Sequence, residues 1–460
     1  MKRIFYLLFL SFLLLPQAAS AYDFESDGIL YYIIASSGEK ECGVDGSSFA
    51  NYSRDVTIPD SVEYNGTVYA VTAIGSNAFA HDRLTSITIP KTVTDIGAWA
   101  FEGCSGLTSI TIPDGVTTIG QSAFLDCSGL TSVTLSSSVT SVDYWNAFAG
   151  CTNLISIDVD EKNECYSSMD GLILDKSGST LIHVPGGMTS VTIPSSVTSV
   201  NTNAFHGCTN LISIDVDEKN ECYSSMDGSL LDKSGSTLIR VPIGVTSVSI
   251  PDGVTSIGAW AFYGCSGLTS ITIPDGVTSI GAWAFYGCSG LTSITIPDGV
   301  TSIGQHAFRG CSNLKSVVLG TGVESIGRRA FVGCTALAEL VSHAVTPPKC
   351  GGSAFEDGID MQNCVLLVPE ESLDLYKAAD PWKDFVSIQA ATEVESLVTD
   401  NGTDNLARVL RMPVTVYTLS GQKLTPAIRA NSAEEALCGQ SSGIYILRGT
   451  DGAACKVMKK

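Results

Sequence analysis

A serine motif is the first feature of the sequence that could carry out covalent chemistry. Residues 439–443, Gly-Gln-Ser-Ser-Gly, fit the Gly-x-Ser-x-Gly pattern of an α/β-hydrolase nucleophile. That mechanism needs a strand-to-helix turn around the serine and a histidine later in the chain. The last histidine is His343, and the flanking residues do not predict such a turn. We therefore expect no catalytic residue and no enzyme activity.

Histidines and clustered carboxylates are the possible metal ligands. The five histidines, at positions 81, 183, 206, 306 and 343, lack the spacing of a zinc site. The acidic segment 158–164 and its copy at 215–221 offer oxygen ligands to calcium, but neither has the remaining ligand or the glycine of an EF-hand loop. Solvated turns are the favoured interpretation, and we expect no metal and no cofactor.

Aromatic side chains at recurring positions offer a different chemistry, that of binding. The position before each Ala-Phe pair holds Trp99, Trp260 and Trp283, but Asn, Ser, His or Arg in other copies. A position that accepts such different residues is not core, so we expect partial exposure. Tyr263 and Tyr286 follow the phenylalanine and should be exposed too. Stacked copies would form a short aromatic strip that stacks on sugar rings or anchors a protein interface. The alternative is that these rings only shield the edges of the coils.

These positions belong to a repeat of 23 residues. The sequence IGAWAFYGCSGLTSITIPDGVTS occupies residues 257–279 and recurs without change at 280–302. The cysteines of four successive copies keep the same spacing, at Cys265, Cys288, Cys311 and Cys334. A fixed period of this length predicts a solenoid, in which each repeat buries its apolar face against the next.

Within one copy, the segment Leu-Thr-Ser-Ile-Thr-Ile places Ile271 and Ile273 on one face of a short strand. Pro-Asp-Gly then turns the chain, a second short strand follows, and Ala-Phe fills a tight turn. We expect Leu268, Phe262 and Cys265 in the core with the two isoleucines. Stacking predicts a mainly β solenoid of about a dozen coils.

Two features vary the repeat. Eight cysteines share one position, where free thiols that act as small hydrophobic side chains are favoured over disulfides. Two gaps of 57 residues separate Cys151, Cys208 and Cys265, and the segments 147–185 and 204–242 are near copies. Each gap should hold two coils, one of which carries a protruding hairpin.

The charge and the ends of the chain constrain its location. The 460 residues carry a net charge of −21, which disfavours nucleic acid and anionic membranes as partners. Residues 1–21 combine two basic residues, an apolar run and a small-residue cleavage site, as a secretory signal peptide does. Since no later run of 18 apolar residues occurs, we expect no transmembrane segment.

The remaining boundaries follow from the repeat. We expect an N-terminal cap at 22–73, the solenoid at 74–340, a C-terminal cap at 341–390, a linker at 391–409 and a small β-sandwich-like domain at 410–460.

Three segments together resemble the BspA-like leucine-rich repeat surface proteins of anaerobic bacteria over roughly residues 22–390. They are IGAWAFYGCSGLTSITIPDGV, SSMDGLILDKSGSTLIHVP and CVLLVPEESLDLYKAADPWKDF. The resemblance implies a right-handed leucine-rich-repeat-like solenoid, secretion or display at the outer-membrane exterior, and adhesion to host proteins, other cells or polysaccharide. A structural spacer without a ligand of its own is the alternative, and we expect a monomer.

The last fifty residues resemble a type IX secretion sorting domain, with VTVYTLSGQKL, GIYILRG and a closing KVMKK. Cys438, Cys455 and a short first strand depart from that pattern. A plain β domain that stays on the mature protein is the other interpretation.

Overall fold

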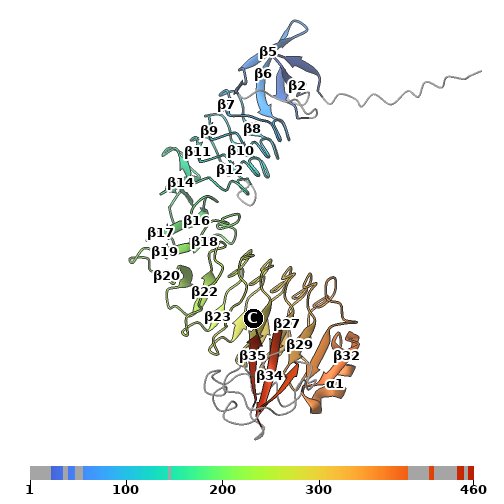
Figure 1. Ribbon diagram of the computed structural model, residues 1–460. Helices are drawn as coiled ribbons and strands as arrows, with labels where there is room; N and C mark the ends of the chain where they lie inside the picture. Colours follow the sequence, from blue (N-terminus) through green and yellow to red (C-terminus); the bar gives the residue numbers. More distant parts are fainter. Residues whose placement is uncertain are drawn as a thin grey trace, which may run out of the picture. The chain divides into compact units, whose positions relative to one another are not determined.

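The computed structural model describes residues 22–34, 40–46, 55–142 and 147–391, together with the backbone of three strands near the C-terminus (Figure 1). The predicted signal peptide and nearly all of the predicted linker lie outside these residues. The chain divides into two compact units, described separately below. Unit 1 comprises the chain to Val254 and Trp260–Gly267, and unit 2 comprises Thr255–Ala259 and the chain from Leu268.

The described chain is strand and turn almost throughout, with helix only near residue 380. Its repeats form a mainly β solenoid of about 14 turns, which confirms the predicted fold class and slightly exceeds the expected dozen. A typical turn contributes one strand of four residues and one of two. Each pairs in parallel with its counterpart one repeat further along, as in Ser279↔Ser302 and Ser293↔Ser316.

Unit 1 begins with a cap of mixed antiparallel and parallel strands that joins the solenoid through β6. The cap strands are β1 (Phe24–Ser26), β2 (Ile29–Ile33), β3 (Glu41–Val44), β4 (Asp55–Thr57), β5 (Ser61–Tyr64) and β6 (Thr67–Ile74). β1, β2 and β3 pair in that order, β5 pairs with β6, and β6 continues in parallel to β8 (Asp95–Ile96). Phe24 stacks on Tyr31 and Tyr64 inside the cap.

Two ladders of parallel strands follow in unit 1. The longer strands are β7 (Ser86–Thr88), β9 (Ser109–Ile112), β11 (Ser132–Leu135), β13 (Ser156–Val159), β17 (Ser190–Ile193) and β19 (Ser213–Val216). The short ones are β8, β10 (Thr118–Ile119), β12 (Ser141–Val142) and β18 (Ser199–Val200). Two three-stranded hairpin segments lie among them, β14 (Tyr166–Met169), β15 (Leu172–Asp175), β16 (Thr180–His183) and β20 (Tyr223–Met226), β21 (Ser229–Asp232), β22 (Thr237–Arg240).

Unit 2 repeats the two ladders and then closes with helical turns. Its short strands are β23 (Ser256–Ile257), β24 (Ser279–Ile280), β26 (Ser302–Ile303), β28 (Ser325–Ile326) and β30 (Lys349–Cys350). Its longer strands are β25 (Ser293–Ile296), β27 (Ser316–Leu319), β29 (Glu339–Ser342), β31 (Val365–Val368) and β32 (Ser387–Ala390). The helical elements are η1 (Glu370–Ser372), α1 (Leu373–Ala378) and η2 (Trp382–Asp384).

Aromatic side chains from this helical segment cover the last turn of unit 2. Trp382 is fully buried, packs edge-on against Phe355 and donates its indole N–H to the Pro348 carbonyl oxygen at 2.9 Å. The buried Tyr376 hydroxyl donates to the Ala344 carbonyl oxygen at 2.9 Å. Beyond residue 391, β33 (Val414–Thr418), β34 (Gly443–Gly449) and β35 (Ala454–Lys459) pair as an antiparallel sheet.

The repeat residues pack as continuous ladders. Phe285 and Phe308 stack with ring centroids 5.1 Å apart, and Phe308 and Phe331 at 5.2 Å, all fully buried. Gly281 lets adjacent turns approach, because a Cβ there would lie 2.5 Å from the Ala259 nitrogen. Such stacking explains why Ala, Phe, Cys and Leu recur at fixed places in every turn.

The core expected from the repeat is confirmed at Phe262, Cys265, Leu268 and Ile273, all of which are buried. The expectation for Ile271 is wrong, because this side chain is half-buried. No strand forms over residues 268–273, so the alternation that buries an equivalent isoleucine in other turns is not imposed.

The cysteine position forms a buried row of free thiols. Most of the Sγ–H groups donate to a backbone carbonyl oxygen of an earlier turn, usually that of a phenylalanine, as Cys104 does to Phe79 and Cys127 to Phe101, both at 3.0 Å. Burial raises the pKa of Cys334 to about 12. These thiols therefore act as small core side chains that also satisfy a buried carbonyl.

Each hairpin segment interrupts the phenylalanine row of unit 1. His183, at the end of β16, lies 5.9 Å from the Phe148 ring, and the Arg240 guanidinium, at the end of β22, lies 5.7 Å from the Phe205 ring. The backbone bond of an ordinary turn is kept, since Val184 N–H donates to Ala204 and Val241 N–H to Ala261. At this position the first hairpin copy therefore has a buried imidazole, and the second has a guanidinium.

The burial of His183 predicts pH-dependent stability. Burial, with His206 as a lesser cause, lowers the pKa of His183 to about 4, against about 6.5 in an unfolded chain. Between these values only the unfolded chain takes up the proton, so stability falls as pH drops from 6.5 towards 4, by up to about 3 kcal/mol. His183→Phe should reduce this loss in urea unfolding measured across the window, whereas removing the exposed imidazole in His81→Asn should not. Equal pH slopes for both variants would contradict the assignment.

A buried asparagine fixes each hairpin segment to the turn before it. The Asn220 amide donates to the carbonyl oxygens of Pro194 and Val197 at 2.8 and 2.9 Å. Its oxygen accepts the backbone N–H groups of Cys222 and Tyr223. All four hydrogen-bonding sites of this side chain are used, and Asn163 repeats the arrangement in the first copy.

Replacing this amide should destabilise the hairpin segment strongly. In Asn220→Asp, a carboxylate cannot donate to two carbonyl oxygens and would bring a negative charge against them, for an expected loss of about 3 kcal/mol. Urea unfolding measures the loss, with the exposed neighbour substitution Glu218→Gln as the control. Equal unfolding midpoints for the two variants would show that the amide does not hold the segment.

Candidate ligand-binding surface

The position before Ala-Phe has a left-handed backbone in most turns. The φ angle is 57° at Trp99, 64° at Trp260 and 60° at Trp283, and His306 and Arg329 share the conformation. Large side chains rarely adopt positive φ, and the cost is on the order of 1–3 kcal/mol. Because asparagine and glycine suit this backbone best, the backbone itself does not favour tryptophan.

Hydrogen bonds between turns impose this conformation. Trp99 N–H donates to Gln121 and Trp283 N–H to Gln305, both at 2.9 Å. Within the turn, the Trp283 carbonyl accepts the N–H of Tyr286 at 3.1 Å. The neighbouring turn therefore holds the residue in place whatever its side chain, which leaves the side chain free to vary.

In unit 1, Trp260 and Tyr263 form a half-buried pair with ring centroids 4.7 Å apart. The buried Arg240 side chain donates to the carbonyl oxygens of Trp260 at 2.8 Å and Tyr263 at 3.3 Å. Its guanidinium also lies 5.9 Å from the Tyr263 ring. Arg240 thus positions both aromatic residues through their backbone.

Trp99 stands apart from this pair in the same unit. It is half-buried, and the equivalent positions one turn before and one turn after hold Asn77 and Ser122. The structure therefore provides no aromatic neighbour for Trp99 along this row.

In unit 2, Trp283 and Tyr286 form a matching half-buried pair with centroids 5.1 Å apart. The next turn extends it, since His306 stacks on Trp283 with centroids 4.1 Å apart and rings within 20° of parallel. The Arg309 guanidinium lies 6.0 Å from the Tyr286 ring. Two consecutive turns thus bring together two aromatic rings, an imidazole and a guanidinium.

The structure brings each Trp-Tyr pair together within one turn. The expected strip from Trp260 to Trp283 joins residues of different units and stays a prediction. Sequence reasoning missed the positive φ of these positions and the contribution of His306 and Arg309. The presence of Asn77 among the tryptophans was the available signal, because asparagine favours a left-handed backbone.

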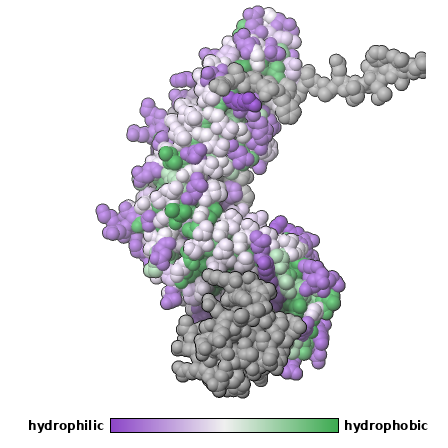
Figure 2. All heavy atoms as spheres, viewed as in Figure 1, coloured by the Kyte–Doolittle hydropathy of each residue, from purple (hydrophilic) through white to green (hydrophobic). Residues whose placement is uncertain are grey.

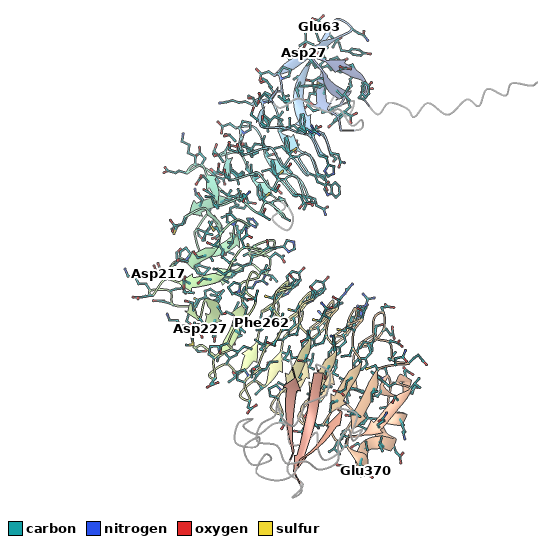
Figure 3. The ribbon with its side chains drawn as sticks, in the orientation of Figure 1. Asp27, Glu63, Asp217, Asp227, Phe262 and Glu370 are labelled. Atoms are coloured by element: carbon teal, nitrogen blue, oxygen red, sulfur yellow. The ribbon has the colours of Figure 1, made fainter. Side chains whose placement is uncertain are left out.

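The other candidate chemistries find no support in the described residues. Within 22–34, 40–46, 55–142 and 147–391, no group of three or more His, Cys, Asp or Glu side chains could hold a metal ion. The acidic segments are turns in which Asp160 and Asp217 accept backbone N–H groups. Figure 3 places Asp217 at the outer edge of unit 1, where Figure 2 shows hydrophilic side chains. Residues 439–442 of the serine motif lie outside the described residues.

A family comparison decides what kind of repeat this is. The model of the BspA type leucine-rich repeat region matches residues 72–169, 185–234 and 242–360, more than half of the chain. The chain belongs to the BspA-type leucine-rich repeat family. In the described part of this BspA-type protein, no helix has the length and apolarity that crossing a membrane requires.

Several solved structures are similar to this BspA-type chain. A leucine-rich cell surface protein from Faecalibacterium prausnitzii is 27% identical, with 80% of this chain and 95% of that chain covered and a TM-score of 0.43. A leucine-rich repeat protein from Bacteroides ovatus is 28% identical, with 81% and 100% covered and a TM-score of 0.35. The pneumococcal vaccine antigen PcpA is 21% identical, with 80% and 98% covered and a TM-score of 0.46. No curated protein matches significantly.

The left-handed backbone at Trp99 can be tested by comparing glycine and alanine. Both Trp99→Gly and Trp99→Ala remove the indole, but only alanine keeps the Cβ that positive φ disfavours. The glycine variant should therefore be more stable, by about 1 kcal/mol in urea unfolding. Glu102, three residues later, has no positive φ, so Glu102→Ala should be at least as stable as Glu102→Gly. The same order at both positions would contradict a strained backbone at Trp99.

Proposed function

We propose that this BspA-type protein is a non-enzymatic binding protein at the exterior of a bacterial cell, and that its half-buried aromatic residues contact the ligand. The observation that carries the proposal is that tryptophan occurs at positions with a left-handed backbone. The equivalent positions of other turns hold Asn77 and Ser122. The binding residues would be Trp99, Trp260, Tyr263, Trp283 and Tyr286.

The aromatic positions suit a binding role because their geometry does not depend on the side chain. The turn-to-turn hydrogen bonds hold the backbone, so a tryptophan there adds cost to the fold. Backbone strain retained at a rigid position is typical of functional sites. Tryptophan and tyrosine also supply large contact areas with few rotatable bonds, which suits protein interfaces and sugar rings alike.

Family membership and the predicted signal peptide at residues 1–21 support an extracellular location. We propose secretion to the outer-membrane exterior through a type IX sorting domain at residues 410–460, for which the antiparallel strands β33, β34 and β35 are suitable elements. The net charge of −21 disfavours nucleic acid as a partner. We expect the protein to act as a monomer.

A structural spacer is the second candidate. The identical copies at 257–279 and 280–302 favour it, because they lengthen the solenoid without adding a new kind of surface side chain. A spacer needs only stacking turns, and its aromatic residues would bind no ligand.

Binding by the aromatic positions can be tested on an array of glycans and extracellular-matrix proteins. The full chain is compared with the variant Trp260→Ser/Trp283→Ser, in which both positions carry the residue found at Ser122. Binding of the array ligands should weaken roughly tenfold or more, since aromatic anchors contribute 2 kcal/mol or more at interfaces.

The control variant Ile155→Ser/Ile212→Ser removes two exposed apolar side chains, 58% and 60% accessible, from other turns. It should bind as the wild type does, and circular dichroism should show both variants folded. Unchanged binding by the tryptophan variant would exclude these positions, and a wild type that binds nothing on the array would favour the spacer.

A further inference from the structure

Arginines are scarce in the described part of this chain, and half of them occur in one part of unit 2. The protein has 26 Lys and Arg against 47 Asp and Glu. Between residues 22 and 391 there are six arginines, and three of them are Arg309, Arg328 and Arg329. They belong to two consecutive turns.

The three arginines lie near the aromatic cluster of Trp283, Tyr286 and His306. His306 N–H donates to the Arg328 carbonyl at 2.9 Å, and Arg309 N–H to the His306 carbonyl at 3.1 Å. Burial lowers the pKa of His306, and the positive charges of Arg309, Arg329 and Arg328 lower it further, so all three lie within electrostatic reach of the imidazole. We call these six residues the unit 2 patch.

Among the described residues, no ion pair neutralises the charges of the unit 2 patch. Over the part of the chain that the structure describes, the salt bridges join Lys91 to Asp114 and Lys383 to Asp380, and none involves these arginines. Arg328 is exposed, and Arg309 and Arg329 are half-buried. The acidic Glu356 of the following turn accepts the Ser353 hydroxyl instead. The patch therefore offers three guanidinium groups beside two aromatic rings.

We propose that the unit 2 patch binds an acidic polysaccharide, with sugar rings against Trp283 and Tyr286 and carboxylate or sulfate groups on the arginines. This proposal rests on the proposed function and names the class of its ligand. Guanidinium groups bind carboxylate and sulfate oxygens through paired N–H donors. Aromatic faces supply the apolar contact that a sugar ring needs.

The spacing of the turns favours a polysaccharide over an acidic peptide. Adjacent turns of unit 2 are joined by parallel strand pairing, so they repeat about 4.8 Å apart, which is close to the length of one sugar unit in an extended polysaccharide. An extended peptide presents side chains to one face every second residue, about 6.7 Å apart. The repeat of a polysaccharide lying along the turns therefore matches the spacing of successive positions such as His306 and Arg329, and the repeat of a peptide does not.

The clustered positive charges of the unit 2 patch should also lower the stability of the free protein, and binding of an acidic ligand would relieve this repulsion. Like charges held together destabilise a folded chain. Replacing the arginines by neutral residues should therefore leave the melting temperature unchanged or raise it. If the arginines only supported the fold, the same replacement would lower it.

The test compares the full chain with the variant Arg309→Leu/Arg328→Gln/Arg329→Asn. Each new residue occurs at the equivalent position of another turn, as Leu125, Gln305 and Asn77. The probes are polygalacturonate and chondroitin sulfate, with neutral dextran and poly-glutamate for comparison, in calorimetric titrations at low and high salt. The wild type should bind the two acidic polysaccharides, more weakly at high salt, and the patch variant should lose roughly tenfold or more in affinity.

A matched control, Arg83→Gln/Lys162→Gln/Lys219→Gln, removes the same charge from exposed positions of unit 1. It should keep the wild-type affinity for acidic polysaccharide. Equal affinity of the patch and control variants, or a patch variant with a lowered melting temperature and unchanged binding, would overturn the proposal. Tighter binding of poly-glutamate would also overturn it in favour of an acidic peptide.

The two proposals can fail separately. If the array ligands are lost in Trp260→Ser/Trp283→Ser while the arginine variant binds acidic polysaccharide like the control, the ligand class is wrong and the aromatic binding function stands. If the wild type binds neither the array nor the acidic polysaccharides, both proposals fail.

Discussion

Hydrogen bonding between successive turns is the constraint on which this structure depends. Thr117 N–H donates to Thr94, and Thr301 N–H to Thr278, each at about one repeat's separation and 2.8 to 2.9 Å. A single turn cannot satisfy these backbone groups or bury its phenylalanine without a neighbour. The cap of unit 1 and the helical segment of unit 2 supply that neighbour at the ends. Because the backbone is fixed in this way, surface positions can carry residues that the local fold does not favour.

The sequence predicts the solenoid well because its core residues recur. Phe262, Cys265 and Leu268 repeat with a fixed period, and the physical reason is that each must meet its own copy in the next turn. Ile271 shows the limit of this reasoning. Its sequence is the same as that of a buried counterpart, but the strand that would orient it does not form.

The candidate surface was only partly predictable, because it depends on backbone geometry and on contacts across turns. Exposure of Trp283 followed from the variety of residues at its position. Its positive φ and its stacking on His306 depend on how two turns meet, which no single turn encodes. The four hydrogen bonds of Asn220 were hidden for the same reason, since an asparagine in an acidic turn resembles a solvated residue. Arg309 and Arg329 vary between copies, and only the stacked structure shows that they gather at one place.

The interrupted phenylalanine row of unit 1 has a consequence for how the solenoid unfolds. Its buried residues form one cluster from Phe24 to Ile173 and another from Leu172 to Leu230. The imidazole and guanidinium at the ends of β16 and β22 replace stacked rings between turns. In a linear array, cooperativity passes from each turn to the next through such interfaces. Unit 1 would then unfold in separate blocks bounded by its hairpin segments. A solenoid with an uninterrupted phenylalanine row would instead unfold as a whole.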